Sequence, residues 1–343
     1  MTEVQENPSS FPAGTPVVID EQPMVFWDRD DARTQVEFLR SIDPTYFVYL
    51  AAIHEAQLEG ENDLSAAVAL RVTYSHVLES LFAFIGAAVQ SPHCPAGWLL
   101  KYKFTDLKGF VEKISDRKPL HNKLNLDRPG WREVASALLP WGTTDDDGEE
   151  RRDASAKLWK SLARDMLDES FNGEYNSLKH GCRIRSGEWF LNIGAESTPG
   201  TPPPPDRMRQ LGASRYGSTF LRALPLQKHY WGLEEQRVNW NPVTFARRIP
   251  LITDSLYNVL TFLKVQNGVS TEELELAFFD QAAVSEALSD SNPSGVTRFA
   301  VRHRIDPRTL PSLSKEGILD LYSETSEPSS GPQEKEPSKS TPP

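Results

Sequence analysis

An arginine and a histidine stand on one predicted helix at a spacing that could carry acid–base chemistry. Arg71 and His76 are separated by four residues, Val72 to Ser75. An imidazole exchanges protons near neutral pH, whereas a guanidinium keeps its positive charge at any physiological pH. The pair therefore offers proton transfer beside a fixed cation, and we take Arg71 and His76 as candidate catalytic residues.

A second group of polar side chains lies close to Gly181. Lys179 and His180 come three and four residues after Asn176, so the three side chains share one helical face. Arg183 comes just beyond them. Together they could hold an anion, with His180 as a further candidate catalytic residue. The alternative is a helix C-terminus, because glycine often ends a helix and cations are favoured in its last turn.

Several common chemistries have no support in the sequence. There is no Ser/His/Asp order in a strand-turn-helix setting, no glycine-rich loop after a strand and no HExxH helix. The cysteines are Cys94 and Cys182 alone, so neither a disulfide framework nor a thiolate metal site is expected. We therefore predict no metal and no cofactor.

The spacing of Arg71 and His76 resembles the signature of the HEPN-like superfamily of helical, often RNA-cutting, prokaryotic domains. The stretch from Tyr175 to Gly181 resembles a Tyr-Asn-x-x-Lys-His-Gly turn of helical bacterial proteins, some of them HEPN-like. In general shape the resemblance covers about residues 45 to 265. It implies that the histidine acts on a ribose hydroxyl and the arginine steadies the phosphate, without a metal.

The resemblance implies a bacterial cytoplasmic protein that binds or cleaves RNA by His/Arg chemistry, in defence or in the stress response. Whether the chain is an enzyme stays open. The rival hypothesis is a non-enzymatic helical module for protein–protein interaction, which needs no catalytic residues and would take a protein partner or form a homodimer.

Two helical stretches must position these residues. Apolar residues keep helical spacing from Asp63 to Gln90, in rows broad enough to predict a helix at the centre of a bundle. A second amphipathic helix from Ala154 leads into the Tyr175 turn. Beyond it, residues 182 to 193 alternate between apolar and polar around Ser186-Gly187, which predicts a β-hairpin.

The composition is that of a soluble globular protein. The chain has 343 residues, of which 38% are hydrophobic and 25% charged, and a net charge of −11. The most apolar run, Leu78 to Val89, is too short to span a bilayer and contains Glu79, so we expect no membrane association. Residues 101 to 132 hold nine basic and four acidic side chains, a local excess that could contact phosphate or could be solvated helix surface.

We therefore predict a mainly α fold, a helical bundle of about six to eight helices with a small β-hairpin insertion. Residues 1–24 are expected to be a mobile leader and residues 323–343 a disordered tail, because both lack apolar periodicity. Residues 25–322 would form a single helical domain, with the hairpin and a proline-rich insertion near residues 182–226.

Overall fold

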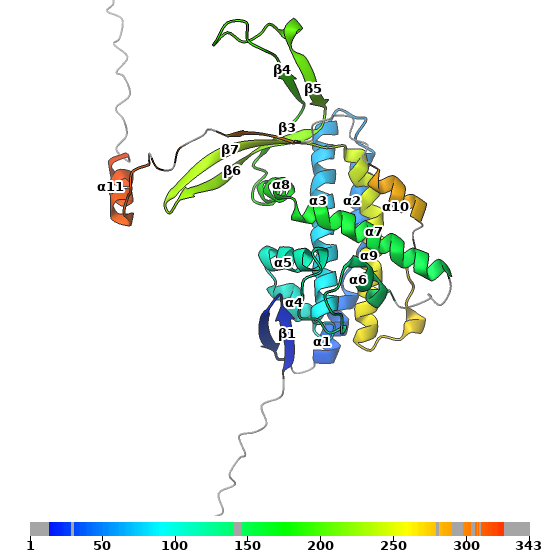
Figure 1. Cartoon of the computed structure of the whole chain (residues 1–343). Helices are drawn as coiled ribbons and strands as arrows, with labels where there is room; N and C mark the ends of the chain where they lie inside the picture. Colours follow the sequence, from blue (N-terminus) through cyan, green and yellow to red (C-terminus); the bar gives the residue numbers. More distant parts are fainter. Residues whose placement is uncertain are drawn as a thin grey trace, which may run out of the picture. The chain divides into compact units, whose positions relative to one another are not determined.

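The chain folds into a mixed α/β structure (Figure 1). The computed structural model describes residues 14–28, 31–139, 146–278, 281–289, 298–302, 306, 308 and 310–325. It is 55% helical and 18% strand, with strands β1 to β8 in three sheets. The prediction of a mainly α bundle with one small hairpin is therefore wrong.

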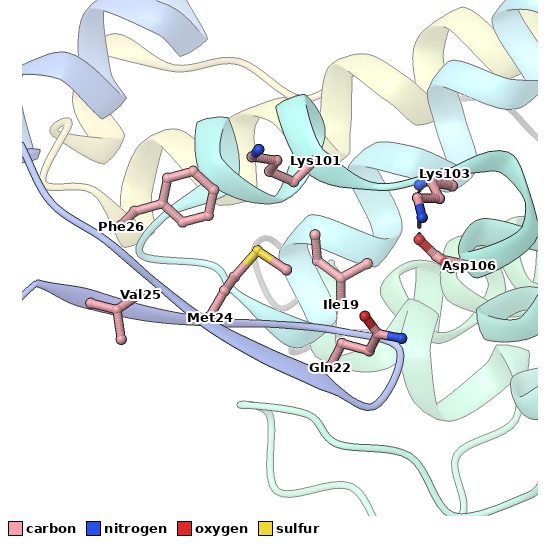
Figure 2. A pocket seen from close by; sticks show the side chains of 8 residues that line it. All are labelled: Ile19, Gln22, Met24, Val25, Phe26, Lys101, Lys103 and Asp106. Atoms are coloured by element: carbon pink, nitrogen blue, oxygen red, sulfur yellow. Dashed lines mark hydrogen bonds between the residues drawn. The ribbon is translucent and has the colours of Figure 1, made fainter.

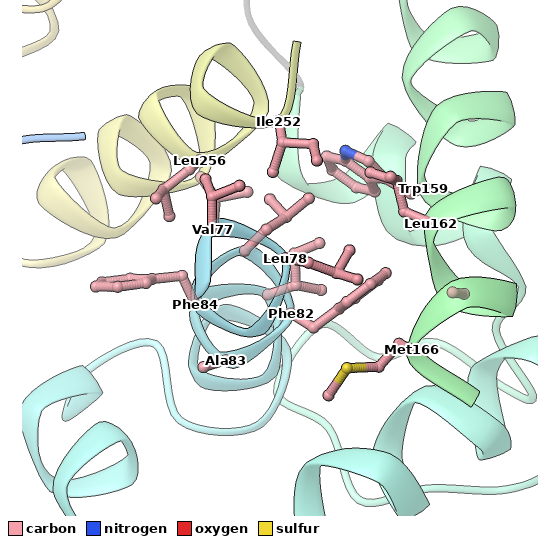
Figure 3. Packing of buried hydrophobic residues seen from close by; sticks show 14 of the residues in the cluster. Val77, Leu78, Phe82, Ala83, Phe84, Trp159, Leu162, Met166, Ile252 and Leu256 are labelled. Carbon is pink, nitrogen blue, oxygen red and sulfur yellow. The ribbon is translucent and has the colours of Figure 1, made fainter. Parts of the chain in front are cut away.

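Helix α3 (Asp63–Gln90) is the centre of the hydrophobic core. Phe82 is 0% exposed and belongs to the same cluster as Ile252 and Leu256 of α9 (Pro242–Gln266) and Trp159 of α7 (Asp146–Leu167) (Figure 3). By length and composition α3 could cross a membrane, but 78% of its most apolar window is buried inside the protein. It is the core helix that the apolar spacing predicts.

Shorter helices surround α3, apart from the helix at Lys315–Thr325, which belongs to a different compact unit (Figure 1). α8 packs against α3 and carries the predicted Tyr175 turn. The bounds are α1 Asp31–Arg40, α2 Thr45–Glu55, α4 Pro95–Lys101, α5 Phe104–Ser115, α6 Trp131–Leu138, α8 Glu169–Lys179, α10 Gln281–Leu288 and α11 Lys315–Thr325; Pro205–Arg207 and Thr271–Glu273 are 3-10 turns.

A β-hairpin precedes the first helix. Strand β1 (Thr15–Ile19) pairs antiparallel with β2 (Gln22–Phe26). Val17 and Ile19 are buried against the core at 0% and 2% exposure. The prediction that residues 1–24 form a mobile leader is therefore wrong for residues 14–24. These strands leave little sign in the sequence, because the apolar alternation at Val17 and Ile19 is very short. Residues 1–13 and 326–343 lie outside the described residues.

The strands after α8 do not pair as the sequence predicts. β3 (Ile184–Ser186) pairs with β6 (Gly217–Gln227), in a sheet of order β3-β6-β7-β8 that also contains β7 (Tyr230–Asn239) and β8 (Arg298–Arg302). β4 (Trp189–Ile193) pairs instead with β5 (Arg209–Ser214) in a separate two-stranded ribbon. The chain therefore leaves one sheet at Gly187 and enters another. The predicted β-hairpin around Ser186-Gly187 does not form, because β3 and β4 do not pair with each other.

The chain divides into two compact units. The larger contains residues 1–221 and 235–300, and the smaller contains residues 222–234 and 301–343. Every residue named as a candidate site residue belongs to the larger unit.

Candidate functional site

Arg71 points into the protein core. Its Nε and Nη2 atoms donate to Oε2 of Glu174 at 2.8 and 2.6 Å, and the two side chains are 7% and 0% exposed. The guanidinium also lies 4.2 Å from the centre of the Phe171 ring and 4.9 Å from that of Phe245. Arg71 is thus enclosed by an ion pair and two aromatic rings.

Glu174 is the carboxylate to which several elements are tied. Besides Arg71 of α3, Ser218 of β6 donates to its Oε1 through the hydroxyl, and Trp240, just before α9, donates through Nε1 at 2.9 Å. A buried carboxylate needs such donors because it has left water. Glu174 of α8 is therefore tied to α3, to β6 and to the residue that precedes the N-cap of α9.

His76 lies on a different face of α3. Five residues on an α-helix correspond to a rotation of about 140°, so a buried Arg71 turns His76 outward. His76 reaches the surface, and one side of its ring is covered by Tyr175 of α8, which it meets edge-on with 5.6 Å between ring centroids. The structure does not bring Arg71 and His76 together into one site.

The environment of His76 favours its neutral form. Partial burial lowers the pKa of His76 below its ordinary value, the carboxylate of Glu79 opposes this shift, and the ammonium group of Lys179 adds to it. A neutral imidazole at physiological pH can accept a proton.

Glu79 of α3 accepts hydrogen bonds from two residues of α8 and from Tyr102. Its Oε2 accepts from the Tyr175 hydroxyl at 2.6 Å and from Nζ of Lys179 at 3.4 Å, and its Oε1 accepts from the Tyr102 hydroxyl at 3.3 Å. Burial and the Glu79 charge raise the pKa of both tyrosines, so they remain protonated donors. We name His76, Glu79, Tyr102, Tyr175 and Lys179 the α3–α8 cluster.

The cations at the end of α8 are exposed. His180 is the C-cap residue, and its backbone N–H donates to the carbonyl of Asn176 at 3.1 Å. Gly181 and Cys182 then have positive φ angles of 112° and 51°, as the alternative of a helix C-terminus predicts. The side chains of Asn176, Lys179, His180 and Arg183 all face solvent, so this group retains the exposure that anion binding requires.

Spacing alone did not reveal Glu79 and Tyr102 as members of the site. Glu79 carried a signal, since it is the lone carboxylate in the apolar run from Leu78 to Val89. Tyr102 carried none, because it reaches Glu79 from the junction of α4 and α5, more than twenty residues along the chain. Within the described part of the chain, no three His, Cys, Asp or Glu side chains gather as a metal-ligand set.

Comparisons with known proteins add no relative. No family model matches the chain, and neither the curated proteins nor the solved structures contain a match to it.

Proposed function

We propose that the protein binds RNA in the cytoplasm through the surface where α8 ends, as the HEPN-like resemblance implies, with a role in defence or stress. The observation that carries the proposal is the group of exposed cations there, Lys179, Arg183 and Arg185, beside the exposed His180 and next to His76. Cations that neutralise phosphates supply most of the affinity of sequence-independent nucleic-acid binding. The net charge of −11 repels nucleic acid at long range, but the charge is unevenly distributed, so a local basic surface can still contact phosphate.

The same surface suits metal-independent cleavage of the strand. His76 would take the proton of a ribose 2′-hydroxyl, whose oxygen attacks the phosphorus while the bond to the 5′-oxygen breaks and that oxygen takes a proton from solvent. Lys179 lies close enough to lower the pKa of His76, so it can pair with the phosphate that Arg71 cannot reach. In this proposal Lys179, and not Arg71, stabilises the charge on the phosphate.

Binding is tested by fluorescence anisotropy of a labelled single-stranded RNA of about 20 nucleotides over a range of salt concentrations. The double variant Lys179→Glu/Arg183→Glu should weaken binding at least about tenfold and make the salt dependence shallower by about 0.7 per lost phosphate contact. Lys160→Glu, an exposed charge reversal on α7, should change Kd less than about twofold. Equal losses in the two proteins would contradict the proposal.

Cleavage is tested on denaturing gels in the presence of a chelator. The wild-type protein should cut the RNA, and His76→Ala should abolish cutting while leaving binding and the circular dichroism spectrum unchanged. Binding without any cutting by the wild type would retain the RNA-binding proposal and remove the enzymatic one.

A second candidate function, a protein-interaction module, is favoured by the outer face of α2. Tyr46, Tyr49 and Ile53 lie there at helical spacing with exposures of 56%, 64% and 36%. An apolar stripe of this kind on a surface helix is typical of a contact with another protein. Sedimentation equilibrium would detect a homodimer, which Tyr49→Lys should dissociate.

A further inference from the structure

A pocket opens between the β1–β2 hairpin and the junction of α4 and α5 (Figure 2). Its lining includes Lys101 and Lys103, on either side of Tyr102 in the sequence, but no residue of the α3–α8 cluster. It encloses about 350 Å³. That volume lies at the lower end of the range for small-molecule sites. Neither the RNA-binding proposal nor the α2 stripe uses these side chains.

The wall that the hairpin contributes is mostly apolar, with Gln22 as its polar residue. Met24 and Phe26 of β2 and Ile19 of β1 line it, and Met24 lies across the middle of the pocket in Figure 2. Phe26 is fixed in place by Gly97 of α4, where a Cβ atom would come within 2.8 Å of the ring. The pocket therefore has a preformed hydrophobic surface.

The opposite wall is positively charged. Lys101 and Lys103 contribute to the lining, and within the described part of the chain neither ammonium group has an ion-pair partner. Asp106 is the one acidic lining residue; its Oδ2 accepts from the backbone N–H of Lys103 at 2.9 Å and so caps α5. Two positive charges and one negative charge leave the lining with a net charge of +1.

We propose that this pocket binds an amphipathic monoanion, an acyl chain that ends in a carboxylate or another singly charged group. The chain would lie on Met24, Phe26 and Ile19, and the anionic group would meet Lys101 and Lys103. A net charge of +1 matches one negative charge and disfavours a dianionic phosphate, which would leave an uncompensated charge beside Asp106. The ligand could be a free acyl acid or an anionic lipid of a bilayer, since both present this chemistry.

The first arm of the test measures binding of octanoate and decanoate monomers by isothermal titration calorimetry. Decanoate should bind saturably, and each added methylene should strengthen binding by up to roughly fourfold until the pocket is filled. Lys103→Glu and Met24→Asp should each weaken binding at least about tenfold, whereas Lys160→Glu should leave Kd within twofold. Thermal unfolding of each variant checks that it is folded.

The second arm measures cosedimentation with phosphatidylcholine vesicles that contain about one quarter phosphatidylserine. Binding to vesicles alone, lost in Lys103→Glu, would identify the bilayer lipid as the source, and binding of decanoate alone would identify a free acid. Equal binding of decanoate and decanol, or no binding in either arm, would overturn the proposal. RNA binding is tested separately with the Lys179→Glu/Arg183→Glu variant. A failure of the acyl-anion proposal therefore does not affect the RNA-binding proposal, and the reverse also holds.

Discussion

Arg71 is buried in an ion pair with Glu174. The Glu174 carboxylate that it neutralises is fully buried, so removing the arginine leaves a charge without its counterion. Loss of one partner of a buried pair costs about 3–5 kcal/mol. We expect Arg71→Ala to lower the free energy of unfolding by that amount, measured by urea denaturation.

Glu174→Gln supplies the control, because an amide keeps an acceptor for Ser218 and Trp240 but removes the charge. In that background Arg71→Ala should cost clearly less. A loss below about 1 kcal/mol for Arg71→Ala alone would mean that the arginine is accessible after all, and would reopen its catalytic candidacy.

His76 should titrate below the ordinary histidine value of about 6.5, because its ring is partly withdrawn from water. Lys179→Met should raise the pKa and Glu79→Gln should lower it further, since these charges act in opposite directions. The unfolded chain then binds the His76 proton at a higher pH than the folded chain does. The contribution of His76 to the free energy of unfolding is therefore fully present above about pH 6.5, the pKa in the unfolded chain. It is lost as the pH falls from there through the lower pKa of the folded protein.

The measurement is an NMR titration of the imidazole Cε1–H resonance, with Lys160→Met as a charge-matched control that should leave it unshifted. Shifts of the same sign in Lys179→Met and Glu79→Gln would contradict the geometry of the α3–α8 cluster.

Substituting alanine for two helical glycines should change the stability of the protein in opposite directions. A Cβ on Gly86 of α3 would lie 2.5 Å from the Trp98 indole, which is stacked on Tyr102 and donates to Gln90. The usual gain of about 1 kcal/mol for Gly→Ala in a helix is then outweighed by an overpacking cost of about 1–3 kcal/mol. Gly86→Ala should destabilise the protein in thermal unfolding.

Gly109 of α5 is the matched case, because the nearest atom to its added Cβ would be a carboxylate oxygen of Asp20 at 3.6 Å. Gly109→Ala should therefore stabilise the protein by up to about 1 kcal/mol. Stabilisation by both substitutions would show that Trp98 can move.

How well the sequence predicted an element depended on whether its cause was local. The apolar spacing of Asp63–Gln90 predicted α3 correctly, and it also placed Arg71 in the same row as Ala67 and Leu78, a sign of burial that the Arg71/His76 spacing obscured. The alternation after Cys182 predicted strands correctly but not their partners, which lie about thirty residues away in β6 and twenty in β5. Pairing over such distances is decided by the whole fold.

At the scale of the molecule, the β4–β5 ribbon should be dispensable for folding. It forms its own two-stranded sheet, and Phe190 and Ile193 are 68% and 57% exposed. Trp189 and Ser214 face each other at its base, so an Asn-Gly turn can replace residues 190–213. The melting temperature should stay within about 3 °C of the wild type in calorimetry. A larger fall would show that the ribbon packs against the rest of the larger unit.

The conformation of Cys182 has a practical consequence. Cys182 is exposed, next to Arg183 and two residues after His180, whereas Cys94, the other cysteine of the chain, is buried and 1% exposed. A maleimide dye added to the unaltered protein should therefore attach at one position, within a few residues of the surface proposed to meet RNA. The fluorescence intensity or anisotropy of that single dye can then report RNA binding without an engineered cysteine.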